Sequence, residues 1–173
     1  YLLLKNKPKN KISFLKKHFG KLSLKKLNTI KLHSPKISEH TSIIAKEKKI
    51  RIILKNYQRK FAKKNKKVCI EGRDIGSVIL PSADIKFFFK CDIKTAAKRR
   101  FKELKKLDPK ISLKSVKISI RTRNFRDSTR KNSPLIFSPD SVLVDTGKLK
   151  SIPDMVNKMS KEVKKKIIEK YGD

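Results

Sequence analysis

Three short apolar runs, set between longer stretches of helical pattern, constrain the fold of this chain most strongly. The runs are Val68-Cys69-Ile70, Ile85 to Phe89 and Ser141 to Asp145. Short strands separated by helices pair in parallel, because each helix carries the chain back across the sheet. The faces of parallel sheets are covered by helices. We therefore expect an α/β fold in which helices cover a parallel sheet.

Helical spacing of apolar residues predicts where the helices lie. From Ser38, which fits an N-cap, the pattern predicts two helices separated near Lys46 to Lys49. Asp92 is placed to cap a helix that runs through Leu104. Lys105 to Ser112 is expected to be a loop, and Ile152 to Tyr171 an amphipathic terminal helix.

The beginning of the chain fits two structures. Four apolar residues fit a short helix: Ile12, Phe14, Leu15 and Phe19. The alternative is a hairpin that turns at Phe19-Gly20, between strands at Lys11 to Lys17 and Lys21 to Leu27. The pattern leaves both open.

The chain is strongly basic, with a net charge of +33. Clustered lysine binds phosphate backbones by counterion release, so a basic nucleic-acid-binding protein is a second hypothesis. However, the lysines are spread along nearly the whole chain, and the aromatic residues form no RNA-recognition pattern. We expect only nonspecific RNA adsorption at low salt. No apolar run approaches the roughly 18 residues of a membrane span, so we expect a cytoplasmic protein without a membrane partner. We also expect the protein to be a monomer.

Cysteine and histidine spacing predicts neither a disulfide nor a metal site. Cys69 and Cys91 lie in or beside apolar runs and form no Cys-x-x-Cys pair, which favours small buried thiols. His18, His33 and His40 lack the spacing of metal ligands. We expect these histidines at the surface.

Arginine is confined to one window of the chain. All nine arginines lie between Arg51 and Arg130, whereas lysine occurs throughout. Because the guanidinium fork suits phosphate and carboxylate groups, we expect an anion site in this window. Arg123, Asp127 and Arg130 share one face of a predicted helix, a spacing that an exposed, ion-paired face would also explain. Polar residues that follow a buried strand, such as Gly72-Arg73-Asp74, are candidate ligand sites.

Several motifs occur in a fixed order along the chain. They are Gly72-Arg73-Asp74-Ile75-Gly76-Ser77-Val78, Pro81-Ser82-Ala83-Asp84, Arg123-x-x-Arg126-Asp127-x-x-Arg130, Ser133-Pro134-Leu135 and Asp140 to Thr146. In this order, from about Ser38 to the C-terminus and including Arg51 and Gln58-Arg59, the chain resembles bacterial cytidylate kinases. The resemblance implies a P-loop nucleoside monophosphate kinase fold. It also implies transfer of the γ-phosphoryl group of ATP, with Mg²⁺, to CMP or dCMP in pyrimidine nucleotide metabolism.

The resemblance also implies roles for individual residues. The cytosine ring is read by three residues, Ser42, Arg51 and Asp74. The rest of the substrate is held by four more: Asp127 and Arg123 for the sugar, Arg73 and Arg130 for the phosphate. Of these, Arg73, Arg123 and Arg130 are the implied catalytic residues. The lid around Lys105 to Ser112 carries Arg99, Arg100 and Arg126.

The sequence departs from the family at several positions. Asn124 stands where Asp is usual, Thr95-Ala96 where Glu-Arg is usual, and His33 where Arg often occurs. With glycine only at positions 20, 72, 76, 147 and 172, no Gly-x-x-x-x-Gly-Lys-Ser/Thr motif is present to cradle the ATP phosphates.

We expect the chain to be N-terminally truncated, without the first strand and the P-loop, and inactive alone. A noncatalytic remnant of such a kinase is the alternative. Residues 1–37 would then be a partial N-terminal core with a reduced monophosphate-binding region. Residues 38–173 would be the remainder of the kinase core, with the lid near 99–130.

Overall fold

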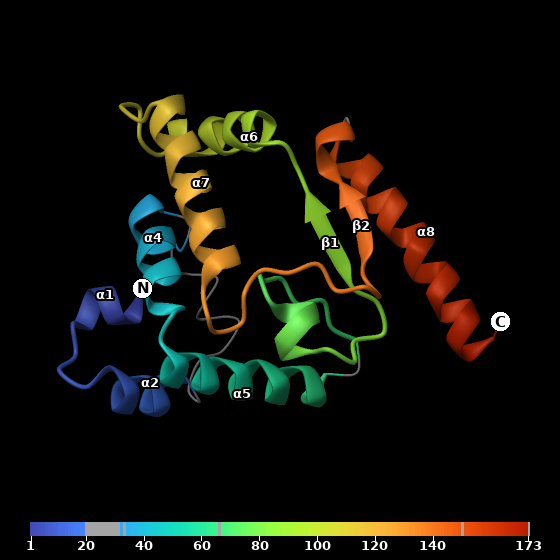
Figure 1. Cartoon of the computed structure of the whole chain (residues 1–173), viewed down its shortest axis with the longest axis horizontal. Coiled ribbons are helices and arrows are strands. Elements are labelled where there is room, and N and C mark those ends of the chain that lie inside the picture. The colour runs from blue at the N-terminus through green and yellow to red at the C-terminus, as the bar shows by residue number, and fades with distance from the viewer. Residues whose placement is uncertain (20–31, 33, 66, 150, 173) are drawn as a thin grey trace. The chain divides into compact units, whose positions relative to one another are not determined.

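A computed structural model describes residues 1–19, 32, 34–65, 67–149 and 151–172. The chain divides into two compact units (Figure 1). The first unit combines Tyr1–Ile75 with Thr122–Leu135, and the second combines Gly76–Arg121 with Ile136–Asp173. The division falls within two helical elements, η1 (Ile75–Ile79) and α7 (Leu113–Thr129).

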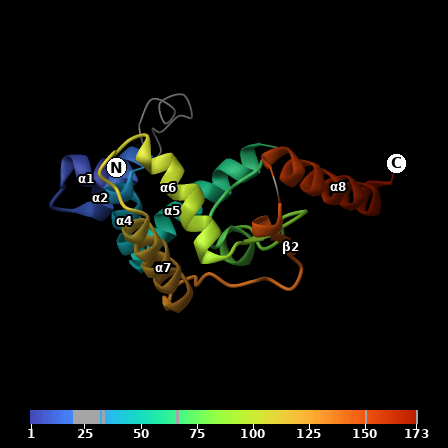
Figure 2. The same ribbon diagram turned by 90° about the horizontal axis from the view of Figure 1, so that it is seen from above.

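The described part of the first unit consists of helices. They are α1 (Leu2–Asn6), α2 (Lys11–Phe19), α4 (Pro35–Ile44), α5 (Lys48–Lys64) and the last residues of α7. Their apolar sides meet in a small core around Leu3, Leu15 and Ile50, because burying these side chains removes apolar surface from water. Helices α2 and α5 pack against each other (Figure 2), with Phe19 edge-on to Tyr57.

Helix α2 decides between the two structures expected for the beginning of the chain. The helix alternative is confirmed for Lys11–Phe19, and the hairpin is wrong because its first strand would fall within this helix. The proposed second strand, Lys21 to Leu27, lies outside the described residues.

Helix α4 begins earlier than expected. Its N-cap is Ser34 rather than Ser38, since the Ser34 side chain accepts a hydrogen bond from the Ile37 backbone N–H at 3.2 Å. Pro35 takes the first helical position, where the missing N–H costs nothing and the fixed φ favours the helix. The expected separation into two helices is confirmed and lies between Ile44 and Lys48.

The second unit contains a parallel pair of strands, β1 (Phe87–Lys90) and β2 (Val142–Asp145). Phe87 lies opposite Val142, and Lys90 lies opposite Asp145. Helix α6 (Ile93–Lys105) follows β1, while η2 (Thr146–Lys148) and α8 (Ile152–Tyr171) follow β2. The parallel pairing and the intervening helices confirm the expected α/β class.

The cap of α6 confirms the sequence prediction. Asp92 accepts a hydrogen bond from the Thr95 backbone N–H at 2.8 Å. The Thr95 side chain first, and then this backbone N–H, lower the pKa of the Asp92 carboxyl. The helix buries Ala97 and Leu104, two of the residues expected on its core side. Helix α8 has the predicted bounds.

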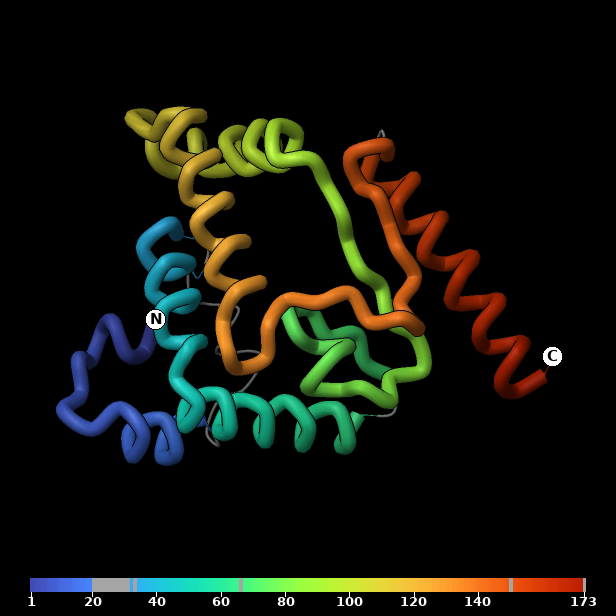
Figure 3. The backbone as a smooth tube through the Cα atoms, viewed as in Figure 1, coloured from blue at the N-terminus to red at the C-terminus, as the bar shows by residue number. Residues whose placement is uncertain are grey.

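Two expectations about strands are wrong. Val68-Cys69-Ile70 forms no strand, because a strand needs a ladder partner and this segment has none among the described residues. Figure 3 traces the course of the backbone through this segment. The Cys69 thiol is consequently exposed rather than buried, and both cysteines are free. Strand β1 begins at Phe87, two residues later than expected, and the residue before it, Lys86, is buried.

The histidines are less exposed than expected. His18 and His40 are half-buried, and the His18 ring stacks on Phe14 with centroids 4.0 Å apart. His33 lies outside the described residues. No helix built from the described residues combines the length and the apolar character needed to cross a bilayer.

Candidate functional site

The residues of the candidate site come from three segments of the first unit. The last turns of α7 carry Arg123 and Asp127 on one face, since residues four apart lie above one another in a helix. Arg130 follows directly after the helix, and its backbone N–H donates to the carbonyl of Arg126 at 3.1 Å. Arg51 lies in the first turn of α5. The third segment brings in Arg73 and Asp74, directly after Gly72.

Gly72 allows close packing in that third segment. A Cβ atom at this position would lie 2.7 Å from Cγ1 of Ile75, closer than Cβ atoms approach other heavy atoms. Any larger residue would have to displace the Ile75 side chain, which lies one position beyond Asp74. The glycine therefore supports the local geometry.

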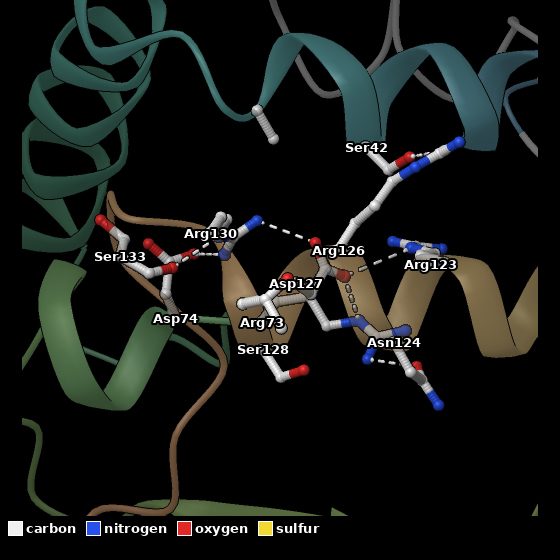
Figure 4. A network of polar contacts seen from close by, with 12 residues as sticks. Ser42, Arg73, Asp74, Arg123, Asn124, Arg126, Asp127, Ser128, Arg130 and Ser133 are labelled. Atoms are coloured by element: carbon white, nitrogen blue, oxygen red, sulfur yellow. Dashed lines mark hydrogen bonds and ion pairs between the residues drawn. The ribbon is translucent and has the colours of Figure 1, made fainter.

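Asp127 is the centre of the site (Figure 4). Its side chain is only 3% exposed, and Oδ1 accepts a hydrogen bond from Nη1 of Arg130 at 2.9 Å. The other oxygen, Oδ2, lies 3.4 Å from Nε of Arg73 and 3.7 Å from Nε of Arg123. One buried carboxylate thus faces three guanidinium groups.

Asp74 is the second buried carboxylate. Its Oδ2 accepts a hydrogen bond from Nη2 of Arg51, and its Oδ1 lies 3.7 Å from Nη2 of Arg130. Arg130 therefore lies between the two carboxylates. The backbone also fixes Arg130, because its Nε donates to the carbonyl of Ser133 at 2.6 Å.

Ser42 and Arg126 form a separate contact in the same unit. Ser42 is buried on α4, and its hydroxyl donates to the backbone carbonyl of Glu39 at 2.8 Å. The same oxygen accepts a hydrogen bond from Nη1 of Arg126 at 3.1 Å (Figure 4). Arg126 thus joins α7 to α4.

We call the guanidinium and carboxylate residues of these contacts the arginine cluster; its members are Arg51, Arg73, Asp74, Arg123, Arg126, Asp127 and Arg130. The cluster has five positive and two negative side chains. Burial lowers the pKa of Arg73, and the nearby Arg123 charge lowers it further. Burial also lowers the pKa of Arg130, with Arg51 as the next cause. An anionic ligand would relieve this excess of positive charge.

Several buried polar atoms of the cluster are unsatisfied. Nε of Arg51, Nη2 of Arg130 and Nε of Arg123 have no hydrogen-bond partner among the described residues. Buried N–H groups without a partner are costly, so they are candidate donors to the oxygens or ring nitrogens of a ligand. The cluster can therefore bind a group that is anionic and rich in acceptors.

All seven residues that the sequence assigned to substrate binding lie in the first unit. Six of them share the contacts around Asp74 and Asp127, whereas Ser42 contacts Arg126. The expected lid residues Arg99 and Arg100 belong to the second unit. Nη2 of Arg99 donates to the carbonyls of Thr146 and Leu149, and Arg100 pairs with Glu103.

Sequence reasoning did not find every group in these contacts. Asn124 accepts a hydrogen bond from Nη1 of Arg73 at 3.0 Å, although the sequence showed it only as a departure from the family. The carbonyl of Ala45 accepts from Nη1 of Arg51 at 3.1 Å, as that of Ser133 does from Arg130. Backbone carbonyls carry no residue-type signal, so no pattern could have identified them.

Among the described residues, no group of three or more His, Cys, Asp or Glu side chains could hold a metal ion. Asp74 and Asp127 are each surrounded by guanidinium groups, which disfavours a cation beside them. The excess of guanidinium groups over carboxylates favours an anionic ligand.

Comparisons with known proteins point to one family. The family model described as cytidylate kinase matches residues 3–165. Cytidylate kinase of Azorhizobium caulinodans is 39% identical over 128 residues, which cover 74% of this chain and 62% of the relative. Cytidylate kinase of Pediococcus pentosaceus is 40% identical over 123 residues, covering 71% and 54%. That of Fusobacterium nucleatum is 37% identical over 135 residues, covering 78% and 61%. The chain therefore spans less than two thirds of the length of each of these relatives.

Proposed function

Because this chain belongs to the cytidylate kinase family, we propose that its arginine cluster binds the phosphoryl acceptor, CMP or dCMP, of an ATP-dependent kinase. The contact between Arg51 and Asp74 carries the proposal, since it presents a buried donor beside a buried carboxylate. A ligand ring that carries hydrogen-bond acceptors next to an amino group would match it, because the acceptors can face Arg51 and the amino group can face Asp74.

Cytosine has this combination of groups. Its O2 and N3 accept hydrogen bonds, and its exocyclic amine donates. Nε of Arg51 is a free donor for the ring acceptors, while Asp74 and Ser42 offer oxygens to the amine. Uracil has the O4 carbonyl in place of the amine and an N3–H in place of the N3 acceptor. Its O4 would therefore face the Asp74 carboxylate, and two acceptors would oppose each other. The arrangement favours cytosine.

The remaining cluster residues suit the sugar and the phosphate. We assign Asp127 and Arg123 to the sugar hydroxyls, and Arg73 and Arg130 to the phosphate oxygens. A phosphate monoester has a second pKa near ~6 and is largely dianionic at pH 7, so it attacks without a general base. The remaining task is to position two anions and neutralise charge, for which Arg73, Arg123 and Arg130 are the catalytic candidates.

The donor substrate, ATP, and the Mg²⁺ ion that accompanies it belong to the same proposal. When bound, Mg²⁺ neutralises the charge of the donor phosphates. The described residues offer it no cluster of ligands, so we derive no step through it. The lid role of Arg99, Arg100 and Arg126 stays a prediction, as do the division at residue 37, the monomeric state and the cytoplasmic location.

The variant Asp74→Asn tests the base assignment. The amide can donate to O4 of uracil, so the ratio of UMP Kd to CMP Kd should fall by about tenfold or more. Isothermal titration calorimetry on this chain with CMP, dCMP and UMP measures the ratio, and circular dichroism checks folding. Asp84→Asn, at an exposed carboxylate of the second unit, is the matched control.

An unchanged ratio in Asp74→Asn would contradict the assignment. The second hypothesis is tested with the same protein. Adsorption of RNA to the lysines should collapse between 50 and 200 mM salt, because it rests on counterion release. Tight, sequence-selective RNA binding at 200 mM salt, without CMP binding, would favour a nucleic-acid-binding protein instead.

A further inference from the structure

Arg73 has two anchors on α7, and they differ in charge. Its Nε faces Oδ2 of Asp127 at 3.4 Å, and its Nη1 donates to Oδ1 of Asn124 at 3.0 Å (Figure 4). One anchor is a carboxylate, and the other is a neutral amide. The two contacts fix the plane of the guanidinium group from two sides. They engage Nε and Nη1, so Nη2 is the candidate donor to a ligand.

Arg73 shares its carboxylate partner with other arginines. Asp127, the carboxylate that Arg73 contacts, also faces Arg123 and Arg130. Glu71 adds a second negative charge that acts on Arg73. Asn124 supplies an acceptor oxygen in the place where a carboxylate would also fit, but it brings no negative charge. The arginine cluster therefore keeps five positive and two negative side chains, and the contact with Asn124 leaves that balance unchanged.

We infer that Asn124 is a positioning residue, which holds Arg73 toward the acceptor phosphate without neutralising it. The inference rests on the proposed function. A phosphate dianion brings two negative charges, so the cluster with its ligand keeps a single positive charge. An aspartate at position 124 would remove that excess and weaken the attraction for the dianion, although the geometry of Arg73 would survive.

The test compares two ligands that differ only in the phosphate. The Kd values of CMP and cytidine are measured by calorimetry, and the ratio of cytidine Kd to CMP Kd reports the phosphate contribution. In Asn124→Asp the ratio should fall by about tenfold, since a charge a few ångströms from a dianion costs that much at partial exposure. In Asn124→Ala, which frees Arg73 but adds no charge, it should fall by about threefold.

Phe125→Asp is the matched control. It adds the same charge at the next position of α7, on a side chain that is 69% exposed. The ratio should stay close to that of the wild type. A fall equal to that of Asn124→Asp would show that net charge, rather than contact with Arg73, decides the affinity, and would overturn the inference.

The pH dependence supplies a readout that a merely structural residue would not change. CMP binding to the wild type should weaken as pH falls from 7 to 5, because the phosphate loses its second charge near pH ~6. The other charged groups of the arginine cluster are the same in the wild type and in Asn124→Asp, so a difference between the two pH profiles comes from position 124. In Asn124→Asp the loss should be smaller, since a less positive site discriminates less between dianion and monoanion.

Two failures can be told apart. If the wild type binds CMP, but Asn124→Asp leaves both the ratio and the pH profile unchanged, only the role of Asn124 is overturned. If the wild type binds no CMP, the proposed function fails, and this inference fails with it.

Discussion

Carboxylates pair with arginine in the interior of the first unit and with lysine at the surface of the second. The side chains of Asp74 and Asp127 are 11% and 3% exposed, and their partners are guanidinium groups. Those of Asp84 and Asp140 are 67% and 63% exposed, and their partners are Lys170 and Lys86. The same kind of ion pair therefore exists in two environments.

The difference teaches what arginine supplies in this chain. One guanidinium group can donate to several acceptors in a plane, as Arg130 does toward Asp127 and Ser133. An ammonium group is a point charge that water solvates well, which suits a pair at the surface. A site that binds an anion needs guanidinium groups, because a guanidinium group that is already paired with a carboxylate still has N–H donors in fixed positions.

Loss of one carboxylate should separate the two environments most clearly. Asp127→Ala leaves the buried Arg130 and the partly exposed Arg73 and Arg123 beside one another without their carboxylate, so the free energy of unfolding should drop by about 3 kcal/mol. Asp84→Ala, at the pair with Lys170 in which both side chains are exposed, should leave it unchanged within error. Urea denaturation followed by far-ultraviolet circular dichroism measures both. Equal, small losses would mean that the cluster is as solvated as the surface pairs.

Much of the fold could be predicted from the sequence, because local signals agreed with the tertiary structure there. Helix α8 follows a clear apolar period, and Asp92 offers the only good cap before α6. Ser38 was the wrong cap, although the signal for Ser34 was present in the proline that follows it. The strand at Val68-Cys69-Ile70 failed because apolar character alone does not supply a ladder partner.

The site divides in the same way. The common face of Arg123 and Asp127 follows from helical geometry, so the sequence alone could predict it. Nothing local joins Arg51 to Asp74 or Arg126 to Ser42; these residues were grouped by resemblance to a family. Asn124 shows the limit of both approaches, because its role depends on a contact with a residue 51 positions away.

Exchange of the two cations should sharpen the comparison, with a smaller effect. Arg130→Lys keeps the charge but cannot donate to Ser133 and Asp127 together while facing Asp74, so CMP affinity should fall by about tenfold or more. Lys170→Arg, the reverse change in the pair with Asp84, should change neither CMP affinity nor stability. Calorimetry and thermal unfolding measure these effects.

Full CMP affinity in a folded Arg130→Lys protein would show that charge alone is enough. The selective use of arginine between Arg51 and Arg130 would then have no explanation in binding. A loss in Lys170→Arg would contradict the view that the surface pairs tolerate either cation.

The smallest effect concerns the pH response of the second unit. Lys86 is buried beside Gly76 and donates to Oδ2 of Asp140 at 2.5 Å, and this hydrogen bond lowers the pKa of the Asp140 carboxyl. The lowered pKa means that the pair stabilises the fold above the ordinary value of about 3.9, and that this contribution is lost as pH falls through the lowered value. Nuclear magnetic resonance titration of Asp140 should give a pKa below the ordinary value in the wild type and a higher pKa, closer to the ordinary value, in Lys86→Met. Because Asp140 is largely exposed, unfolding at pH 7 should change little. An identical titration in both proteins would mean that water, rather than Lys86, solvates the Asp140 carboxylate. The exposed carboxylates of the second unit would then differ from the buried Asp74 and Asp127 even more than their ion pairs indicate.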